Sequence, residues 1–168
     1  MAKNSSKAVM ILASALCFFS LLGKAYGDDS KFYVVGTVYC DTCRTQFVTR
    51  ISELMHQAKV RLECREREDG KVTYSVDGET DNLGVYHLPV EGDREEEVCE
   101  IHLVESSDPE CSDIDNKTYL KKSARISLTR DSGIASKNRI ANPLGFMKKD
   151  PLPECPEVLK ELGITLGE

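Results

Sequence analysis

The cysteines of this 168-residue chain constrain its fold more than any other feature. Seven are present, and one of them, Cys17, lies in an apolar N-terminal segment. The other six follow that segment and are Cys40, Cys43, Cys64, Cys99, Cys111 and Cys155. An even number of cysteines behind a secretory signal predicts disulfides, because thiols pair and stay paired in oxidising compartments. The chain therefore predicts three disulfides, whose pairing the spacing alone does not choose.

The N-terminal segment has the parts of a secretory signal peptide. Lys3 and Lys7 supply positive charge, residues 8–22 form a mainly apolar run, and the small residue Gly27 suits a signal peptidase. The run is shorter than the roughly 18 to 20 apolar residues that a membrane-spanning helix needs. We expect cleavage after Gly27, which makes residues 1–27 a signal peptide and residues 28–168 a single secreted domain.

The charge of the predicted mature chain bears on its partners. Removal of residues 1–27 takes away three lysines and no acidic residue, so the formal net charge falls from −6 to −9. A surface this acidic disfavours nucleic acid and anionic lipid as partners. Behind the signal segment the sequence has no second long apolar run, so we expect no membrane insertion.

Alternation of apolar and polar residues with a period of two predicts a mainly β fold. An antiparallel β-sandwich or barrel of about six or seven strands, with one or two short helices and three disulfides, fits this pattern. Asp69-Gly70 predicts a hairpin turn, and Asp77-Gly78 predicts a second break in the chain. The expected strands lie within residues 32–40, 60–64, 72–76, 86–90, 99–103 and 124–128.

Two segments have the features of short helices. Residues 156–163 begin with a proline and end with a glycine, which is the usual order at helix ends. Between the first two strands, apolar residues fall at helical spacing, and these are Phe47, Ile51, Leu54, Met55 and Ala58.

Several motifs resemble those of the olive major pollen allergen family, a group of secreted plant proteins. The segment 35–44, VGTVYCDTCR, is similar to the signature of that family. Further motifs follow in the order found in the family, namely LEC at 62–64, VCEI at 98–101, Cys111, NPLGF at 142–146 and LPEC at 152–155. The resemblance therefore covers essentially the whole predicted mature chain.

The resemblance implies both a disulfide pairing and a function. The implied pairs are Cys40 with Cys111, Cys43 with Cys155, and Cys64 with Cys99. The implied function is that of a secreted, non-enzymatic plant protein of the extracellular space or cell wall, active in pollen hydration or tube growth. The implied partner is a protein, such as a cell-surface receptor kinase, or a component of the cell wall. Family members also occur outside pollen, so the tissue stays open.

Two further motifs are visible. The sequon Asn116-Lys117-Thr118 predicts N-glycosylation of Asn116 on a surface loop. The family resemblance does not support it, because the glycan of the family commonly lies in the region that here reads 130–138, which has no sequon. Residues 80–86, TDNLGVY, resemble the turn-into-strand motif of transthyretin-like sandwiches.

The residues of this second motif have clear physical roles. Asp81 and Asn82 have side chains that can bond the turn backbone. Gly84 can relieve a strained dihedral, and we expect Tyr86 to enter the core.

Redox chemistry is the strongest alternative to a binding function. Cys40-Asp-Thr-Cys43 follows a strand and precedes a helical pattern, where a helix N-terminus lowers a thiol pKa. That arrangement is typical of a thiol-disulfide oxidoreductase. Against it, the chain does not alternate strands with helices, and four further cysteines are available to pair with these two. Protease inhibition by an exposed loop is a second alternative, although no loop has a sequence that marks a reactive peptide bond for a protease.

The remaining patterns predict no catalytic residue, metal or cofactor. A zinc site would need Cys40, Cys43, Cys64 and Cys99 to stay reduced, whereas secretion favours disulfides. Metal-binding spacing is absent among the histidines, and we expect His87 and His102 to face solvent. No Gly-x-Ser-x-Gly motif occurs. The acidic run 93–97 lacks the spaced ligands of a calcium loop and is typical of a solvated hairpin tip.

Overall fold

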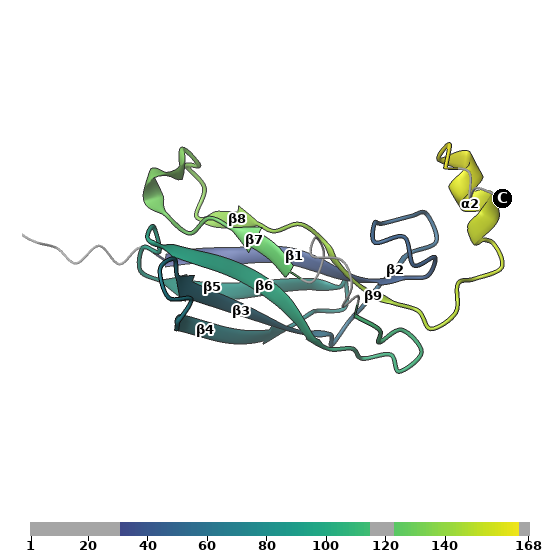
Figure 1. Ribbon diagram of the computed structural model, residues 1–168, viewed down its shortest axis with the longest axis horizontal. Helices are drawn as coiled ribbons and strands as arrows, with labels where there is room; N and C mark the ends of the chain where they lie inside the picture. The colour runs from purple at the N-terminus through teal and green to yellow at the C-terminus, as the bar shows by residue number, and fades with distance from the viewer. Residues whose placement is uncertain (1–30, 115–122, 165–168) are drawn as a thin grey trace, which may run out of the picture.

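The computed structural model describes residues 31–114 and 123–164. The predicted signal peptide and the sequon residue Asn116 therefore lie outside the described residues. Figure 1 shows the arrangement of the elements. In chain order they are β1 (Lys31–Asp41), β2 (Glu53–Leu54), β3 (Lys59–Glu66), β4 (Val72–Glu79), β5 (Val85–Glu91), β6 (Glu97–Glu105), β7 (Ser123–Ile126), the 3-10 turn η1 (Arg130–Ser132), β8 (Asn138–Ile140), β9 (Leu144–Met147) and α2 (Cys155–Glu161).

Strand β1 is the centre of the first sheet and pairs along both of its edges. One edge pairs antiparallel with β5 over Lys31–Thr37 and then with β2 at Tyr39 and Cys40. The opposite edge pairs in parallel with β8 over Tyr33–Val35 and then with β9 over Val38–Asp41. The sheet is therefore mixed, which differs from the purely antiparallel expectation, because the end of the chain returns beside the strand that began it.

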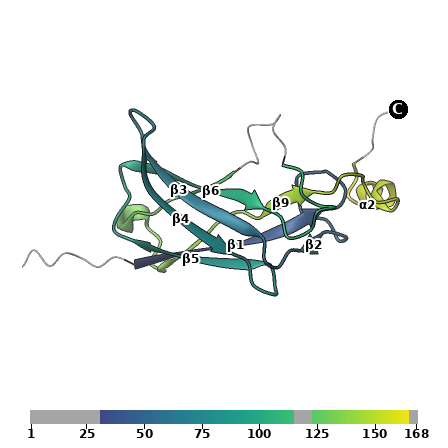
Figure 2. The ribbon, with the colours of Figure 1, turned by 90° about the horizontal axis from the view of Figure 1, so that it is seen from below.

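The second sheet has the order β4-β3-β6-β7 and is antiparallel throughout. Figure 2 shows β3, β4 and β6 lying over β1 and β5. Cys64 of β3 is directly opposite Cys99 of β6, with their Cα atoms 4.0 Å apart, and the two form a disulfide. The predicted mainly β fold, with two sheets and three disulfides, is confirmed.

The core lies between the two sheets and follows the predicted alternation. On β1 the side chains of Phe32, Val34, Val38 and Cys40 are buried, and on β3 those of Val60, Leu62 and Cys64. Their neighbours on β3, from Lys59 to Arg65, are exposed or half-buried, so this strand has one wet face as expected. The two sheets are held together by fully buried apolar residues that include Val34, Val60, Leu62, Tyr86, Leu88 and Ile101.

Two tyrosines lie over glycines of neighbouring strands. Tyr86 of β5 is paired with Gly36 of β1, where an added Cβ would stand 2.2 Å from the tyrosine Oη. Tyr39 of β1 is paired in the same way with Gly145 of β9, where a Cβ would stand 2.7 Å from Cζ of the ring. These glycines are therefore required by the close approach of a side chain.

The predicted helix over residues 47–58 is wrong. This segment consists of turns and the short strand β2. The N–H of Met55 donates to Val38 O (2.9 Å), so Met55 is bonded to β1 instead of to a helical turn. Val48 and Leu54 are exposed while Met55 and Ala58 are buried, so the apolar residues do not share one face. The helical spacing was therefore coincidental, because pairing with β1 decided the conformation.

The predicted break at Asp77-Gly78 is also wrong, since β4 runs through both residues to Glu79. Asp77 forms an ion pair with Arg61 of β3, whose Nε lies 2.6 Å from Oδ1. An added Cβ at Gly78 would stand 2.2 Å from Cδ2 of Leu88. The glycine thus makes room for a core side chain within a strand. The Asp69-Gly70 hairpin is as predicted, with Gly70 at φ +70° between β3 and β4.

The transthyretin-like turn forms as expected from its residues. Oδ1 of Asp81 accepts hydrogen bonds from the N–H groups of Leu83 (2.8 Å) and Val85 (3.0 Å). Gly84 has φ +71°, and Tyr86 is fully buried. The helix at the C-terminal end also forms, as α2. Within the described residues, no helix has the length and apolar content to span a membrane.

A first prediction concerns Tyr86, whose buried hydroxyl has no hydrogen-bond partner among the described residues. Replacing it by phenylalanine removes an unsatisfied polar group, so Tyr86→Phe should raise the free energy of unfolding by about 1 kcal/mol. Tyr74→Phe is the matched control, because its hydroxyl donates to Pro89 O (3.2 Å) and its loss should lower stability. Urea denaturation of the oxidised proteins measures both, and changes of the same sign would contradict the prediction.

A second prediction concerns acid stability. The backbone hydrogen bonds from Val85 and Leu83 lower the pKa of Asp81. The carboxylate contributes its full stabilisation at pH values above the pKa that it has in the unfolded chain, which is about 4. This contribution is lost as the pH falls through the lower pKa that it has in the folded protein. Asp81→Asn cannot titrate, so its urea midpoint should fall less steeply on acidification than that of the wild type. Parallel profiles would show that Asp81 is not responsible.

Candidate functional site

The loop that follows β1 is organised around the buried carboxylate of Asp41. Its Oδ1 accepts hydrogen bonds from the N–H of Cys43 (3.3 Å) and the hydroxyl of Thr45 (3.3 Å). Its Oδ2 accepts the N–H of Gln46 (2.5 Å). Because one side chain binds three groups within five residues, the chain must fold back tightly as it leaves the strand.

Two residues of this loop have backbone conformations that L-amino acids seldom adopt. Arg44 has φ 57° and Gln46 has φ 63°. Such conformations persist where the surrounding contacts hold them in place, and they concentrate at functional loops. Here the hydrogen bonds to Asp41 and the disulfides of Cys40 and Cys43 provide that hold.

The C-terminal helix α2 is fastened to the same loop. Cys43 forms a disulfide with Cys155, the first residue of α2, and the N–H of Leu152 donates to Thr42 O (3.1 Å). Arg50 forms a two-pronged ion pair with Glu161, with Nε–Oε2 at 2.9 Å and Nη2–Oε1 at 3.1 Å. These hydrogen bonds lower the pKa of Glu161. The loop and the helix therefore form one connected surface.

Arg44 attaches this surface to the segment around Cys111. Its Nη1 lies 2.8 Å from Asp113 Oδ2 and donates to the carbonyl of Lys148 (2.5 Å). Beneath it, Cys40 forms a disulfide with Cys111. The three disulfides are thus the pairs that the family resemblance implies.

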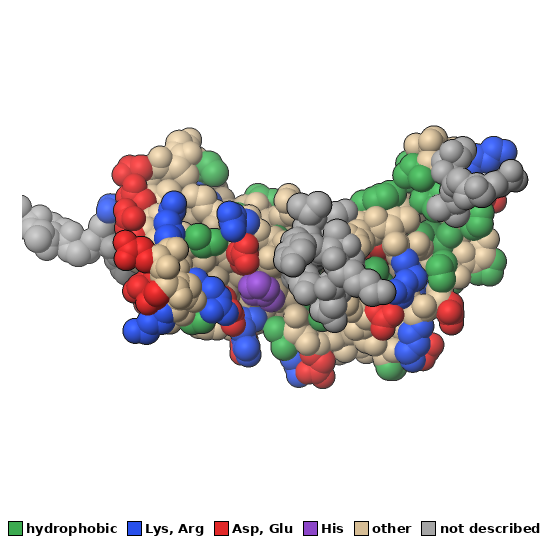
Figure 3. All heavy atoms as spheres, viewed as in Figure 1, with side chains coloured by type: hydrophobic (Ala, Val, Ile, Leu, Met, Phe, Trp, Pro, Cys, Tyr) green, Lys and Arg blue, Asp and Glu red, His purple; other side chains and the backbone are tan. Residues whose placement is uncertain are grey.

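The two ends of the molecule differ in how much apolar surface they carry. Figure 3 shows many acidic side chains at the end away from α2, and hydrophobic side chains around α2 among further charged ones. A cavity of about 550 Å³ lies between the loop and α2. Its lining is mainly apolar and includes Phe47, Leu152, Pro153, Pro156 and Leu159.

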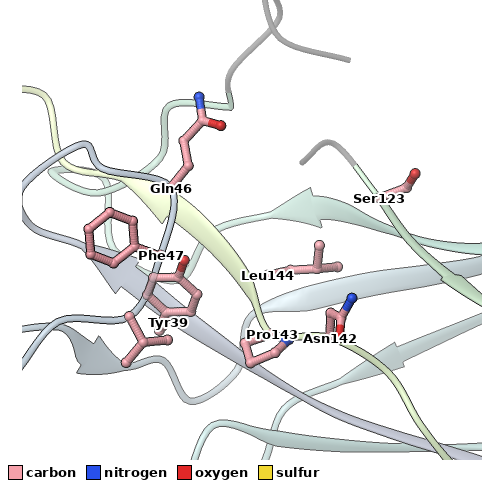
Figure 4. Close-up of a pocket in the computed structure, with 8 residues that line it drawn as sticks. Tyr39, Gln46, Phe47, Ser123, Asn142, Pro143 and Leu144 are labelled. Atoms are coloured by element: carbon pink, nitrogen blue, oxygen red, sulfur yellow. The ribbon is translucent and has the colours of Figure 1, made fainter. Parts of the chain in front are cut away.

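A second, smaller cavity of about 270 Å³ lies on the other side of the same loop. Figure 4 shows Gln46, Phe47 and Tyr39 along one side of it, and Ser123, Asn142, Pro143 and Leu144 along the other. Phe47 contributes to the lining of both cavities. The loop therefore separates two recesses of different character, one mainly apolar and one bordered by amide and hydroxyl groups.

The disulfides bear directly on the redox and zinc hypotheses. Cys40 and Cys43 are each bonded to a distant cysteine and not to one another. The motif therefore lacks the pair of cysteines that an oxidoreductase reversibly joins in a disulfide. Cys64 and Cys99 lie beside Glu97, which makes a cluster of three potential metal ligands, but both sulfurs are joined in a disulfide. A zinc site needs thiolates, and these four cysteines offer none in the oxidised protein.

The histidines and the acidic run lie apart from the loop. His56 and His87 are exposed, and His102 is half-buried with Nε2 4.0 Å from Glu100 Oε2. In the acidic run, Asp93 forms an ion pair with Arg130, whose Nε lies 3.2 Å from Oδ2. Glu97 forms an ion pair with Arg94, whose Nη1 lies 3.2 Å from Oε1. The run is a hairpin tip whose charge is partly neutralised, in keeping with the solvated tip that the sequence predicts.

Sequence reasoning missed the residues that form the smaller cavity. Gln46, Phe47 and Tyr39 come from the N-terminal part of the chain, whereas Asn142 and Pro143 come from the link between β8 and β9. No local motif joins them. The available signal was the pair of apolar faces on β1, since Tyr39 lies on the face turned away from Cys40.

Comparison with known proteins places the chain among pollen proteins. The family model described as "Pollen protein Ole e 1 like" matches residues 30–163. An "Olee1-like protein" from Betula pendula is 60% identical over 160 residues, covering 95% of this chain and 96% of that protein. Pollen allergen Che a 1 from Chenopodium album is 52% identical over 158 residues, or 94% of each chain.

A solved structure is similar as well. The crystal structure of the major plantain pollen allergen Pla l 1 matches with a TM-score of 0.66 at 41% sequence identity. The match covers 74% of this chain and 99% of that chain. The resemblance inferred from the cysteine motifs is therefore confirmed by sequence and by fold.

A third prediction tests the role of Asp41. Asp41→Ala leaves the N–H groups of Cys43 and Gln46 without their acceptor, so the free energy of unfolding should fall by about 2–3 kcal/mol. Amide hydrogen exchange should quicken in residues 42–47. Asp69→Ala is the control, because its carboxylate accepts one exposed N–H, from Lys71 (2.8 Å), and its loss should cost less than about 1 kcal/mol. Equal losses would rule out a special role for Asp41.

Proposed function

The chain belongs to the pollen Ole e 1-like protein family, and from this premise we propose that it acts outside the cell as a non-enzymatic binding protein. The proposal follows the names of its relatives, several of which are pollen allergens. It places the protein in the extracellular space or the cell wall after cleavage of residues 1–27, with a glycan on Asn116. Its role is in pollen hydration or tube growth, with vegetative tissue as a further place of action.

The observation that carries the proposal is that Cys40, Cys43, Cys64 and their three partners are all joined in disulfides. Disulfides persist in oxidising compartments, which supports an extracellular location. A loop held by two disulfides and by Asp41 loses little conformational freedom on binding, which favours recognition. In the described residues, moreover, the sulfurs of the candidate redox motif are already bonded elsewhere.

The surface that we assign to binding is the loop after β1 together with α2. Recognition residues are commonly found on loops that a rigid scaffold positions. This surface is anchored by the Cys43–Cys155 disulfide and the Arg50–Glu161 ion pair, and it contains both recesses. We propose a protein partner such as a cell-surface receptor kinase, or a wall component, as its target.

A fourth prediction tests this function. The oxidised protein, immobilised, should retain a component of pollen plasma-membrane vesicles or of pollen wall extract. The double variant Cys43→Ser/Cys155→Ser frees α2 but keeps the other two disulfides, so it should retain several-fold less. Arg67→Ala is the control, because it alters an exposed cation in the β3–β4 hairpin, which Figure 1 shows at the end away from α2. Its binding should equal that of the wild type.

The outcomes that oppose the proposal are distinct. If neither pollen nor vegetative extracts yield a retained component, the binding function is contradicted. Disulfide-reductase turnover by the purified protein, lost in Cys43→Ser, would replace the proposal by an oxidoreductase function.

A further inference from the structure

We propose that the cavity around Tyr39 binds a neutral saccharide. The inference rests on the extracellular binding function proposed above and gives it a site and a ligand class. Three observations carry it, namely the chemistry of the lining, the hydroxyl of Tyr39 that opens onto the cavity, and the rigid frame that holds the lining in place.

The lining combines an apolar wall with uncharged polar groups. Tyr39, Phe47 and Pro143 give the apolar part, and Gln46, Asn142 and Ser123 give amide and hydroxyl groups. Sugar rings have the complementary character, since their C–H faces pack against aromatic rings while their hydroxyls both donate and accept hydrogen bonds. Amide and hydroxyl side chains also do both, so they match a hydroxyl-rich ligand.

None of the described lining residues carries a charge. Phosphates, sulfates and carboxylates are usually held by arginine, lysine or a cluster of N–H donors, and cations by carboxylates. Against the described lining, an anionic or cationic ligand would therefore lose its hydration without gaining a counter-charge. The lining thus favours a neutral ligand over a charged one.

Tyr39 points to a ligand most directly. Only 3% of the residue is exposed, but its hydroxyl is not among the fully buried polar atoms that lack a partner, so the hydroxyl opens onto the cavity. Figure 4 shows this hydroxyl directed into the cavity, between Phe47 and Leu144. A hydroxyl that opens onto a cavity is able to hydrogen-bond with a ligand hydroxyl placed there. Burial, reinforced by the negative charge of Asp41, raises the pKa of Tyr39 to about 12, so the phenol keeps its proton and can donate at physiological pH.

The frame of the cavity is fixed before a ligand arrives. Gln46 is held at positive φ by the hydrogen bond from its N–H to Asp41. The ring of Tyr39 lies against Gly145, where any larger residue would displace it. Pro143 limits the backbone of the opposite wall. A preformed site loses less entropy on binding, which favours a weakly interacting ligand such as a sugar.

The volume of the cavity limits how many sugar units of a ligand it can hold. A volume of about 270 Å³ is slightly below the roughly 300 to 1,000 Å³ of pockets for drug-sized ligands. The cavity therefore takes one or two sugar units, and the remainder of the saccharide lies outside. Both the neutral polysaccharides of plant cell walls and the neutral glycans of glycoproteins present such units.

A fifth prediction tests the site with Tyr39→Phe, which removes only the hydroxyl. Calorimetric titration uses three probes, namely neutral wall-type oligosaccharides (cellotetraose and galactotetraose), a neutral high-mannose glycan, and oligogalacturonate as the anionic comparison. The oxidised wild type should bind a neutral probe, and Tyr39→Phe should weaken that binding about two- to tenfold, the range expected for one lost hydrogen bond. The neutral probe that binds identifies the wall or the glycoprotein as the source.

The controls separate a binding role of Tyr39 from a structural one. Because the hydroxyl opens onto the cavity and is not a fully buried atom without a partner, Tyr39→Phe should keep the urea midpoint of the wild type. Tyr33→Phe alters a tyrosine of the same strand that is 41% exposed and outside the cavity, so it should leave binding unchanged. Asn142→Ala, at an exposed position of the lining, should weaken binding by a similar factor without unfolding the protein.

Several results would overturn the inference. Absence of binding to all neutral probes, preference for oligogalacturonate, or binding of a neutral probe that Tyr39→Phe and Asn142→Ala leave unchanged would each do so. If the immobilised protein still retains its pollen component in these cases, the proposed function survives without this site. If retention also fails, both are contradicted.

Discussion

Strand β1 is the constraint on which the rest of the structure depends. It is the only described strand that pairs with four others, because each of its edges is shared between two shorter strands. Its last residues, Cys40 and Asp41, then anchor a disulfide and the hydrogen bonds that shape the following loop. Sheet, loop and C-terminal helix are therefore connected through eleven consecutive residues. Changes at the end of this strand act on the core and on the candidate site together.

The two ends of the molecule have different chemistry, because at the α2 end apolar recesses lie beside the ion pairs. At the end with the β5–β6 hairpin tip, carboxylates such as Asp93 and Glu97 are paired with arginines, so the surface is hydrated and partly neutral. At the α2 end the recesses offer aromatic, proline and amide groups instead. Exposed ion pairs add little affinity, whereas rigid aromatic groups contribute strongly to recognition. For this reason the α2 end is the better candidate for a partner.

The sequence predicted what repeats along the chain and missed what depends on contacts between distant segments. Alternation located the buried faces of β1 and β3 because strand periodicity is a local property. The helical spacing of Phe47 to Ala58 was misleading, since pairing of Met55 with Val38 overrides it. Asp77-Gly78 predicts a break in the chain, whereas in the structure Gly78 makes room for Leu88 within a strand. The cavity around Tyr39 could not be predicted from the sequence, because Asn142 is brought to it by the parallel pairing of β9 with β1.

The disulfide pattern also affects the order in which the disulfides can form while the chain is being synthesised. Cys40 and Cys43 emerge first, and their partners follow 71 and 112 positions later. Strands β8 and β9, which complete the outer edge of β1, arrive late as well. For most of its synthesis the growing chain therefore carries two neighbouring thiols that are able to pair with each other or with Cys64. Any such early pair has to be exchanged before the native pairing forms, so isomerase activity in the producing cell should raise the yield of correctly folded protein.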